Sequence, residues 1–456
     1  NLDIQSKSYT KIETSFNENQ YSLNNKSLKY VFIDKTNTLW VSNKLGILYS
    51  NLDEKKFKSI SLQEKKQVRT LFATNNDIFF GFQGDQFYKY NFNTKSYNPI
   101  ILPEYSKPFK VDTLNGKIHL ATTNGLFREV SSKEDKFKLV SVFEDSPEKN
   151  NLLVTSFCKD GFGNQYFGTF RGLLLKTKNK TIWVHQKLKN LDYLRNVRIF
   201  SLKMDYSKNC IWVGTVSKGL FKINLDKSGN ILSAESYSEQ MTGSYKIPNN
   251  SIWCFYQDKD NSLYVGTDTG LLHKKANESQ FYTVEAEDIL NKKIMGIISD
   301  EFSNLWLNNS QGIIKYNLTT KSTNTFNYFD GLLTNTFTEA ISKNNKGELF
   351  FGNISGINYF KSGELYNNPF PSKISFTNLW VNNNKVAVDQ EILGSTILSK
   401  TLNNSNNLVF NHQQNDFSLE FTSTNYANVK VNKYRYKLEN YDEKWKVVDN
   451  KKRFAS

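Results

Sequence analysis

The chain has 456 residues, 38% of them hydrophobic and 14% aromatic, with 23 glycines and 7 prolines. It is therefore not low-complexity, and its length suits one large repeat domain plus a smaller one. The formal net charge is +15, but the Lys and Arg residues are dispersed, so we attribute the charge to a Lys- and Asn-rich composition and not to nucleic-acid binding.

Neither a disulfide framework nor a membrane span is visible. The three cysteines, Cys158, Cys210 and Cys254, form no C-x-x-C pair. Cys158 and Cys254 lie in apolar strand patterns, where a buried and inert thiol is expected. No stretch of 18 or more apolar residues occurs.

The chain opens with two strand-like segments, at residues 1–4 and 8–12. The pattern is already under way at Asn1, and no signal peptide is visible there. We therefore expect this sequence to be a piece of a longer protein, cut at both ends.

One unit then recurs eight times at a spacing of about forty to fifty residues. A typical copy has an apolar run, a polar turn, a strand led by an aromatic residue, a tight turn ending in Gly, and further strands. In the second copy Asp85 takes the place of the turn Gly. The clearest copy covers residues 251–272. The units begin near residues 27, 67, 108, 151, 196, 250, 293 and 335. The second strand opens at Trp40, Phe79, His119, Tyr166, Trp212, Tyr264, Trp306 and Phe350.

This repeat predicts an all-β fold, with a β-propeller over residues 1–370. A four-stranded blade exposes both faces until neighbours stacked around an axis bury them. Eight units predict eight blades; seven is the alternative if one weak unit is a loop or belongs to an upstream domain. The last unit shows three strands, so we expect a strand at residues 9–13 to supply the fourth and close the ring.

After Pro371 the repeat stops, and strand-like alternation continues at residues 374–381, 417–421 and 433–438. Short strands with this turn spacing predict an immunoglobulin-like β-sandwich over residues 371–456. The pattern is still running at Ser456, so we expect this sandwich to be incomplete.

The repeats resemble the two-component regulator propeller repeat. Its pattern is an apolar run, Asp-x-x-Gly, Leu-Trp-hydrophobic-Gly-Thr and then Gly-Leu. Residues 210–215 read Cys-Ile-Trp-Val-Gly-Thr, and Gly219 and Leu220 follow them. Residues 330–337 resemble the element that precedes the last blade in this family.

The end of the chain resembles the three-tyrosine domain of the same family, with tyrosines at Tyr434, Tyr436 and Tyr441. We expect these three and Trp445 to lie in the sandwich core. The resemblance implies the sensor region of a membrane-bound two-component or one-component regulator, at the periplasmic face of the inner membrane. It further implies an oligosaccharide ligand, signalling through a homodimer, and a membrane anchor and an output module (histidine kinase or DNA-binding regulator) outside this chain. Family members often carry two tandem propellers, whereas one is visible here.

A propeller places the loop between strands two and three of each blade on the same face as the loop that leads into the blade. We expect a ligand to bind on this face. Arg can hold a carboxylate or sulfate through two hydrogen bonds, and aromatic rings can stack on sugars. The candidate ligand-binding residues are Arg69, Arg171, Arg195, Arg198, Lys218, Trp253 and Phe337, and Lys44 and Asp268 occupy equivalent turns. The alternative for each is a solvated turn charge or an aromatic residue that packs between blades.

No catalytic residue, metal site or cofactor is predicted. The four histidines have neither metal-ligand spacing nor a nucleophile motif beside them, and His119 takes the aromatic position of its repeat, which favours a core role. The Gly-Thr pairs lack the strand–loop–helix context of a phosphate loop. We therefore expect a binding module that is not an enzyme. The alternatives are a propeller enzyme acting on polysaccharide and a propeller scaffold for a protein partner; a nucleic-acid role would rest on net charge alone.

Overall fold

The computed structural model describes residues 2–3, 8–9, 28–35, 38–43, 46–51, 57–62, 66–102, 105–131, 136–140, 152–187, 193–365, 373–424 and 433–456. The chain divides into two compact units. One unit is Lys55–Tyr366, and the other combines Asn1–Glu54 with Asn367–Ser456.

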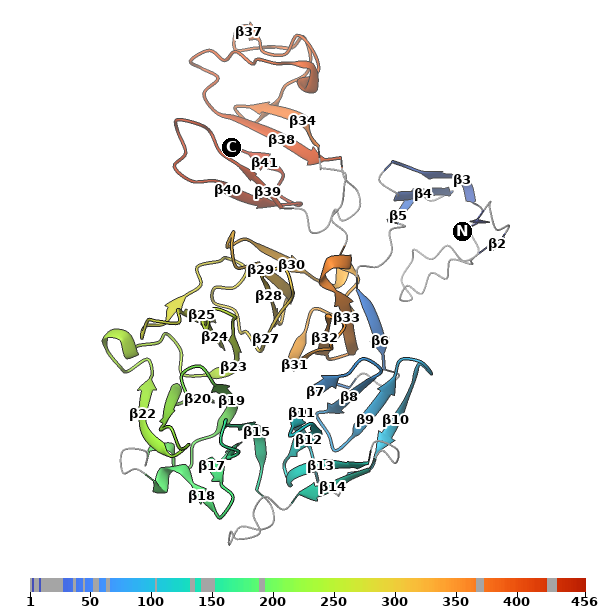
Figure 1. Cartoon of the computed structure of the whole chain (residues 1–456). Coiled ribbons are helices and arrows are strands. Elements are labelled where there is room, and N and C mark those ends of the chain that lie inside the picture. Colours follow the sequence, from blue (N-terminus) through green and yellow to red (C-terminus); the bar gives the residue numbers. More distant parts are fainter. Residues whose placement is uncertain are drawn as a thin grey trace. The chain divides into compact units, whose positions relative to one another are not determined.

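Seven four-stranded antiparallel sheets, each a blade, make up the described part of Lys55–Tyr366 (Figure 1). The first three are β7 (Val68–Ala73), β8 (Asp77–Phe82), β9 (Phe87–Asn91), β10 (Ser96–Ile100); β11 (Pro108–Leu114), β12 (Lys117–Thr122), β13 (Gly125–Ser131), β14 (Lys136–Val140); and β15 (Val154–Lys159), β16 (Gln165–Thr169), β17 (Gly172–Lys176), β18 (Thr181–Trp183). The next three are β19 (Ile199–Asp205), β20 (Cys210–Thr215), β21 (Leu220–Leu225), β22 (Ile231–Tyr237); β23 (Ile252–Gln257), β24 (Leu263–Thr267), β25 (Gly270–Lys274), β26 (Tyr282–Thr283); and β27 (Gly296–Ser299), β28 (Asn304–Asn309), β29 (Gly312–Asn317), β30 (Thr323–Phe326). The seventh, which we name the closing blade, is β31 (Phe337–Lys343), β32 (Glu348–Asn353), β33 (Gly356–Lys361) and β6 (Lys58–Ser61).

The first strands of the blades, β7, β11, β15, β19, β23, β27 and β31, lie side by side around the centre of the ring (Figure 1). Each boundary between neighbouring blades holds its own cluster of buried apolar side chains, including the boundary between the closing blade and the first blade. At that last boundary Val68 and Phe80 pack with Phe350 and Ile357. Since a buried side chain of this size contributes about 1.5–3 kcal/mol, stacking between blades is the main source of stability.

The ring is closed by β6, which pairs with β33 through Lys58–Tyr359 and Ile60–Ile357. The predicted closing strand at residues 9–13 is wrong: β2 (Ser8–Tyr9) pairs with β1 (Leu2–Asp3), and residues 10–13 lie outside the described residues. The physical reason is burial. Ile60 enters the cluster that joins the closing blade to the first blade, and Phe57, 1% exposed, enters the neighbouring one.

The part of the first repeat at residues 28–51 does not belong to this ring. It forms a three-stranded sheet of β3 (Leu28–Ile33), β4 (Thr38–Asn43) and β5 (Gly46–Asn51) in the other unit, so the ring has the seven blades of the alternative and its unit begins at Lys55, not Asn1. The strand β3 exposes four consecutive apolar residues, Tyr30 to Ile33, at 49–77% of their surface. Consecutive strand residues point to opposite faces, so both faces of this strand are open among the described residues.

The turn between first and second strands explains the aromatic residue of the repeat. Asp300 Oδ1 accepts the backbone N–H groups of Phe302 and Asn304. Asp300 Oδ2 accepts Asn304 Nδ2 and, at 2.8 Å, the indole N–H of Trp306. Asp34 holds Trp40 and Asp160 holds Tyr166 at the same spacing of six residues. The aromatic ring that fills the space between blades is thus also fixed by a carboxylate.

The Gly-Thr pair at the end of the second strand serves packing and turn formation. The hydroxyl groups of Thr169, Thr215 and Thr267 donate to the carbonyl groups of Gly172, Gly219 and Gly270 across the turn. A side chain on Gly214 would collide with Ile252 of the next blade, so Gly lets the blades approach closely.

The C-terminal residues form a four-stranded sheet of β35 (Asn384–Lys385), β34 (Ile374–Val381), β38 (Phe417–Ser423) and β41 (Phe454–Ala455). Two hairpins accompany it, β36 (Glu391–Ile392) with β37 (Ser395–Thr396), and β39 (Lys433–Tyr436) with β40 (Lys446–Asp449). The five short 3-10 helices are η1 (Val184–Gln186), η3 (Gly243–Tyr245), η4 (Tyr328–Asp330), η5 (Ser362–Glu364) and η6 (Leu402–Asn404), counted among the described residues. An immunoglobulin-like sandwich stays a prediction.

The aromatic residues of this C-terminal part divide between core and surface. Tyr434 is buried beside Phe421, and its hydroxyl group accepts the N–H of Ser423. Tyr436 is half-buried. Tyr441 and Trp445 are 80% and 55% exposed, so the expected core role is wrong for these two. Both follow β39 in the connection to β40, where turn residues face solvent.

Candidate functional site

A β-bulge at the start of the first strands carries the candidate site. The register of β7, β11, β15, β19 and β23 against the second strand skips one residue, which is Arg69, Phe109, Thr155, Phe200 or Trp253. In β31 the skipped stretch contains Glu339. A bulge re-aims the extra side chain away from the ladder. We name these six residues the bulge ring.

The face predicted from propeller geometry is confirmed by backbone hydrogen bonds. The loop between strands two and three bonds to the loop that leads into the same blade, at Gln83 to Gln67, Thr123 to Lys107, Val216 to Arg198 and Ile354 to Thr336, N–H to carbonyl in each pair. Both kinds of loop therefore surround the bulge ring at one end of the propeller. We name this end the bulge face.

Arg69, Phe109 and Glu339 form the first group on this face. The guanidinium carbon of Arg69 lies 4.0 Å from the centre of the Phe109 ring, and its Nε lies 3.4 Å from Glu339 Oε1. Burial lowers the pKa of Arg69, and the Glu339 charge partly offsets this. Burial also raises the pKa of Glu339, against the opposing effects of a backbone hydrogen bond and the Arg69 and Lys293 charges. The pair is thus only partly compensated for the water it has lost.

Trp253, Phe200, Lys293 and Asp268 form the second group. Phe200 meets Trp253 edge to face, with ring centres 4.8 Å apart. The Lys293 ammonium lies 3.5 Å from the centre of the Trp253 ring, so one face of the indole is already covered. Asp268 Oδ1 accepts the indole N–H at 2.8 Å and lies 3.4 Å from Lys293 Nζ. Asp268 therefore orients both the aromatic ring and the cation.

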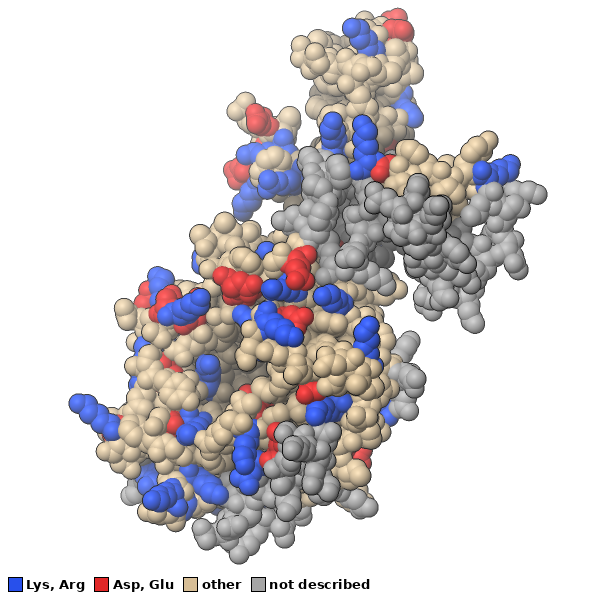
Figure 2. Space-filling model, turned by 45° about the vertical axis from the view of Figure 1, so that its right-hand side comes forward, with Lys and Arg blue, Asp and Glu red and all other residues tan. Residues whose placement is uncertain are grey.

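The other predicted Arg and Lys residues lie on the surrounding loops. Arg198 is exposed and lies 5.2 Å from the centre of the Phe170 ring, which in turn lies 5.9 Å from that of Phe109. Arg171, Arg195 and Lys218 are exposed on the same loops. Lys44 lies outside the described residues. Figure 2 shows Lys and Arg interspersed with Asp and Glu over the face in view, and no single basic patch among the residues drawn in colour.

Phe337 is placed in the core, not at a ligand-binding surface. It is 1% exposed and packs with Trp306, Leu349 and Phe351 between the sixth blade and the closing blade. The register shift of β31 begins just after Phe337, so the residue aimed out of the ladder is Glu339.

Sequence reasoning missed five residues of the bulge face: Phe109, Phe170, Phe200, Lys293 and Glu339. Phe109, Phe200 and Glu339 hold the bulge position in their own repeats. Phe170 directly precedes Arg171, a predicted ligand-binding residue of the same turn. Aligning the repeats on the Gly-Thr pair, to which the bulge is opposite, would have revealed the bulge position. Spacing from the start of each unit did not, because the leading loops differ in length.

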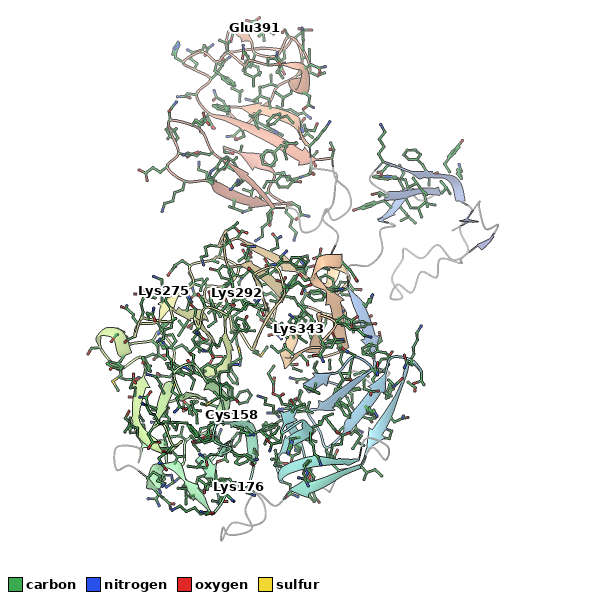
Figure 3. All side chains as sticks on the ribbon, in the orientation of Figure 1. Cys158, Lys176, Lys275, Lys292, Lys343 and Glu391 are labelled. Atoms are coloured by element: carbon green, nitrogen blue, oxygen red, sulfur yellow. The ribbon has the colours of Figure 1, made fainter. Side chains whose placement is uncertain are left out.

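Other polar clusters are weaker candidates. A hollow of about 620 Å³ is lined by Glu301, Lys361 and the turn from Lys343 to Gly347. Two of its ammonium groups already bond to carbonyl oxygens, Lys343 to Ser299 and Lys346 to Asn75. Figure 3 places Lys343 and Cys158 on inner strands near the centre of the ring, and Lys176 and Lys275 toward its rim.

Neither metal ligation nor thiol chemistry is indicated. Among the described residues no group of three or more His, Cys, Asp or Glu side chains gathers to hold a metal ion. His119 is 5% exposed, and burial lowers its pKa, which confirms its core role. Burial raises the pKa of Cys158 and of Cys254 to about 12. Within the residues that the structure describes, no helix has the length and apolarity required to cross a membrane.

Comparison with known sequences finds a family model that matches one of the repeats. The sequence model of the two component regulator propeller matches residues 246–269, which include Trp253 and Asp268 of the bulge face. Histidine kinase P4 of Formosa agariphila is 25% identical over 428 residues, covering 90% of this chain and 30% of that protein.

Solved structures share the fold. The extracellular domain of the hybrid two component system BT3049 of B. thetaiotaomicron superposes with a TM-score of 0.69 at 19% identity, over 96% of this chain and 58% of that one. Virginiamycin B lyase of Staphylococcus aureus superposes with a TM-score of 0.50 at 11% identity, over 67% of this chain and 98% of that one. At such identities the likeness is one of fold, the β-propeller. The chain spans less than a third of the curated relative and just over half of the first solved structure.

Proposed function

We propose that this chain is the extracytoplasmic ligand-sensing region of a membrane-bound two-component or one-component regulator, and that it binds an oligosaccharide on the bulge face. The observation that carries the proposal is the bulge ring itself. Five blades each direct one residue to the same end of the propeller, three of them aromatic and two charged. The sixth member of the ring, Thr155, is buried and donates to the carbonyl group of Ile199.

Aromatic rings and charged groups in this arrangement suit a sugar. Phe109, Phe200 and Trp253 are half-buried, so each ring keeps part of its surface for an apolar contact. The cations of Arg69 and Lys293 lie beside the Phe109 and Trp253 rings, and that of Arg198 lies beside the Phe170 ring. These cations can donate hydrogen bonds to hydroxyl or acidic groups. Bulges on a rigid ring hold the residues in place before binding, which lowers the entropic cost of binding.

The relatives support a sensor over an enzyme. The matched repeat carries the name of a two-component regulator, the curated relative is described as a histidine kinase, and the structure with the higher TM-score is described as an extracellular domain. We propose that the chain lies on the periplasmic side of the inner membrane, that its C-terminal part is a three-tyrosine domain, and that it signals as a homodimer. A ligand can drive such signalling only by binding one arrangement of the dimer better than another.

The testing experiment is a thermal-shift and calorimetric screen of the whole chain against neutral and anionic oligosaccharides. A ligand at one hundred times its dissociation constant stabilises the folded state by about 2.7 kcal/mol, so a hit should raise the melting temperature by a few degrees. We expect a hit, and we expect Trp253→Ala to remove it because the indole ring is lost and Lys293 no longer has the ring against which it is held.

The matched control is Trp445→Ala, which removes a half-exposed Trp that also carries a cation, Arg435, at 4.8 Å. Binding should survive this change. Turnover of a glycan by the chain would overturn the proposal in favour of a propeller enzyme. Binding of a purified protein, with no response to any saccharide, would overturn it in favour of a scaffold for a protein partner.

A further inference from the structure

The ion pair of Arg69 and Glu339 spans the boundary between the closing blade and the first blade. Arg69 lies on β7 and Glu339 on β31, which are neighbouring inner strands. Each side chain keeps 21% of its surface exposed, so the pair is reachable from the bulge face while most of it is shielded from water.

The pair leaves the hydrogen-bonding capacity of Arg69 largely unused. Its nearest approach to Glu339 is 3.4 Å, and Arg69 Nε makes no hydrogen bond to any residue that the structure describes. A guanidinium group binds a carboxylate best through two parallel hydrogen bonds near 2.8 Å. The guanidinium carbon lies 4.0 Å from the centre of the Phe109 ring, so this ring covers the group from one direction. Arg69 therefore has an internal partner that fits it poorly.

We propose that Arg69 is an anion-binding residue of the bulge face, and that an acidic group of the ligand, a carboxylate or a sulfate, takes the place of Glu339 on its guanidinium edge. This inference rests on the proposed function for the position of the ligand and adds the chemical class of the ligand. Lys293 and Arg198 supply further positive charge on the same face, whereas a neutral sugar would have no group to compete with Glu339.

Two arms test the inference and separate it from the proposed function. The first uses no saccharide: melting temperatures are measured in sodium sulfate and in sodium chloride at equal ionic strength. We expect sulfate to raise the melting temperature of the wild type more than that of Arg69→Gln, which should show only the general stabilisation that sulfate gives to folded proteins. The rise should be larger in Glu339→Gln and smaller in Arg69→Lys, which keeps the charge but loses the planar edge. Arg435→Gln, in the other unit, should behave as the wild type. An equal rise in every variant is a general salt effect and overturns the inference.

The second arm uses trigalacturonate and its methyl ester, and a sulfated galactose trisaccharide and its desulfated form. We expect the acidic member of one pair to bind at least about tenfold more tightly, the preference to vanish in Arg69→Gln, and Glu339→Gln to strengthen binding of that member alone. The pair that responds distinguishes carboxylate from sulfate. Weaker binding of both members in Glu339→Gln would mean that Glu339 contacts the sugar directly, which overturns the inference.

The two arms fail differently. Saccharide binding without any acidic preference keeps the proposed function and overturns the inference. An Arg69-dependent response to sulfate with no saccharide binding keeps the anion site and overturns the proposed function. If Arg69→Gln does not fold, Arg69→Lys and Glu339→Gln still give the opposite changes that the inference requires.

Discussion

Two buried tryptophans at the same repeat position differ in one hydrogen bond. Trp306 is 0% exposed and donates its indole N–H to Asp300. Trp212 is 1% exposed, and its indole N–H has no hydrogen-bond partner among the described residues. The spacing explains the difference: Trp306 follows its Asp by six residues, whereas Trp212 follows Asp205 by seven, and Asp205 bonds to Ser207 and Lys208 instead.

This pair gives a matched test of what the carboxylate contributes. Both Trp→Phe changes remove similar volume from a closed core, but only Trp306→Phe removes a hydrogen bond to a charged group. We expect Trp306→Phe to destabilise the protein by roughly 1.5–3 kcal/mol more than Trp212→Phe, measured by urea unfolding. Equal losses would mean that the aromatic residue of the repeat acts through its volume alone.

Asp300 should make the stability depend on pH in the acid range. Burial opposes its charge, but hydrogen bonds from Ser362, Trp306 and Asn304 together outweigh burial, so its pKa lies below the ordinary value. A carboxyl group with a lowered folded pKa stabilises the fold above its unfolded pKa, about 3.9, and loses this contribution as pH falls through the folded pKa.

We expect Asp300→Asn to cost roughly 2–3 kcal/mol at pH 7, because the five groups that donate to Asp300 then face a neutral amide. The difference in melting temperature from the wild type should shrink as pH is lowered from 5 to 3. The control is Asp226→Asn. Its partly exposed carboxylate accepts from Ser228 and Asn230 the counterparts of the three bonds that Asp300 accepts from Phe302 and Asn304, and its loss should be smaller. A difference for Asp300→Asn that stays constant with pH would exclude its charge as the cause.

At the level of single residues, the sequence predicted which repeat positions are buried in the core better than it predicted which side chains point toward the bulge face. His119 is buried as expected, because a position that opens a central strand faces a neighbouring blade whichever residue holds it. Phe337 was misplaced because the bulge that follows it moves the outward direction to Glu339. A bulge depends on strand register, and register comes from long-range pairing that a single sequence does not display.

Among the elements, β6 has the largest effect for its length. It has four residues, Lys-Ser-Ile-Ser, of which only Ile60 is buried. Its pairing with β33 removes the unpaired strand edge that the closing blade would otherwise present. So short and polar a segment shows almost no alternation of apolar and polar residues. For this reason the sequence analysis predicted the closing strand upstream, at residues 9–13.

Two truncations should separate this strand from what precedes it. Removing residues 1–54 leaves β6 and the unit Lys55–Tyr366 intact, so the main melting transition should change little. Removing residues 1–62 also deletes Ile60 and Phe57, and we expect a loss of at least about 3 kcal/mol and a melting temperature lower by several degrees, measured by calorimetry. Equal melting of the two truncated chains would mean that β6 is dispensable.

Removing residues 1–54 should also lower the binding of hydrophobic dyes and the tendency of the chain to associate. It deletes the sheet of β3, β4 and β5, with its exposed Tyr30, Val31 and Phe32. Apolar surface of this kind binds hydrophobic dyes and favours association. The sequence detected this sheet as a repeat because its strand pattern matches the others, but a pattern does not reveal whether neighbours are present to bury it.

For the whole molecule, the count of blades follows from interfaces and not from repeats. Eight repeats are visible, yet seven apolar clusters close a ring, and the strands β3, β4 and β5 of the first repeat contribute to none of them. Propeller architecture was predictable because the repeat is local. The position of the ring's boundary was not, because it depends on which segment fills the last edge.

The closing blade also determines how the propeller responds to tension. The chain enters the ring through β6 and leaves it after β33, and because the two strands are antiparallel both connections leave from the end where Lys58 pairs with Tyr359. Strands pulled apart from a shared end open one pair at a time, like a zipper, instead of resisting together in shear.

Two side-chain contacts flank the paired strands β6 and β33 at this end. Phe57 is wedged between Phe326 and Phe360 just before the first pair, and the Ser362 hydroxyl holds Asp300 just after the last strand. A force on the chain must break the contacts of Phe57 and Ser362 before the hydrogen bonds between β6 and β33 begin to open. The β6–β33 pairing is therefore the part of the ring that opens most easily, and the contacts of Phe57 and Ser362 protect it. A force too weak to break these contacts is transmitted through the closing blade without opening the propeller.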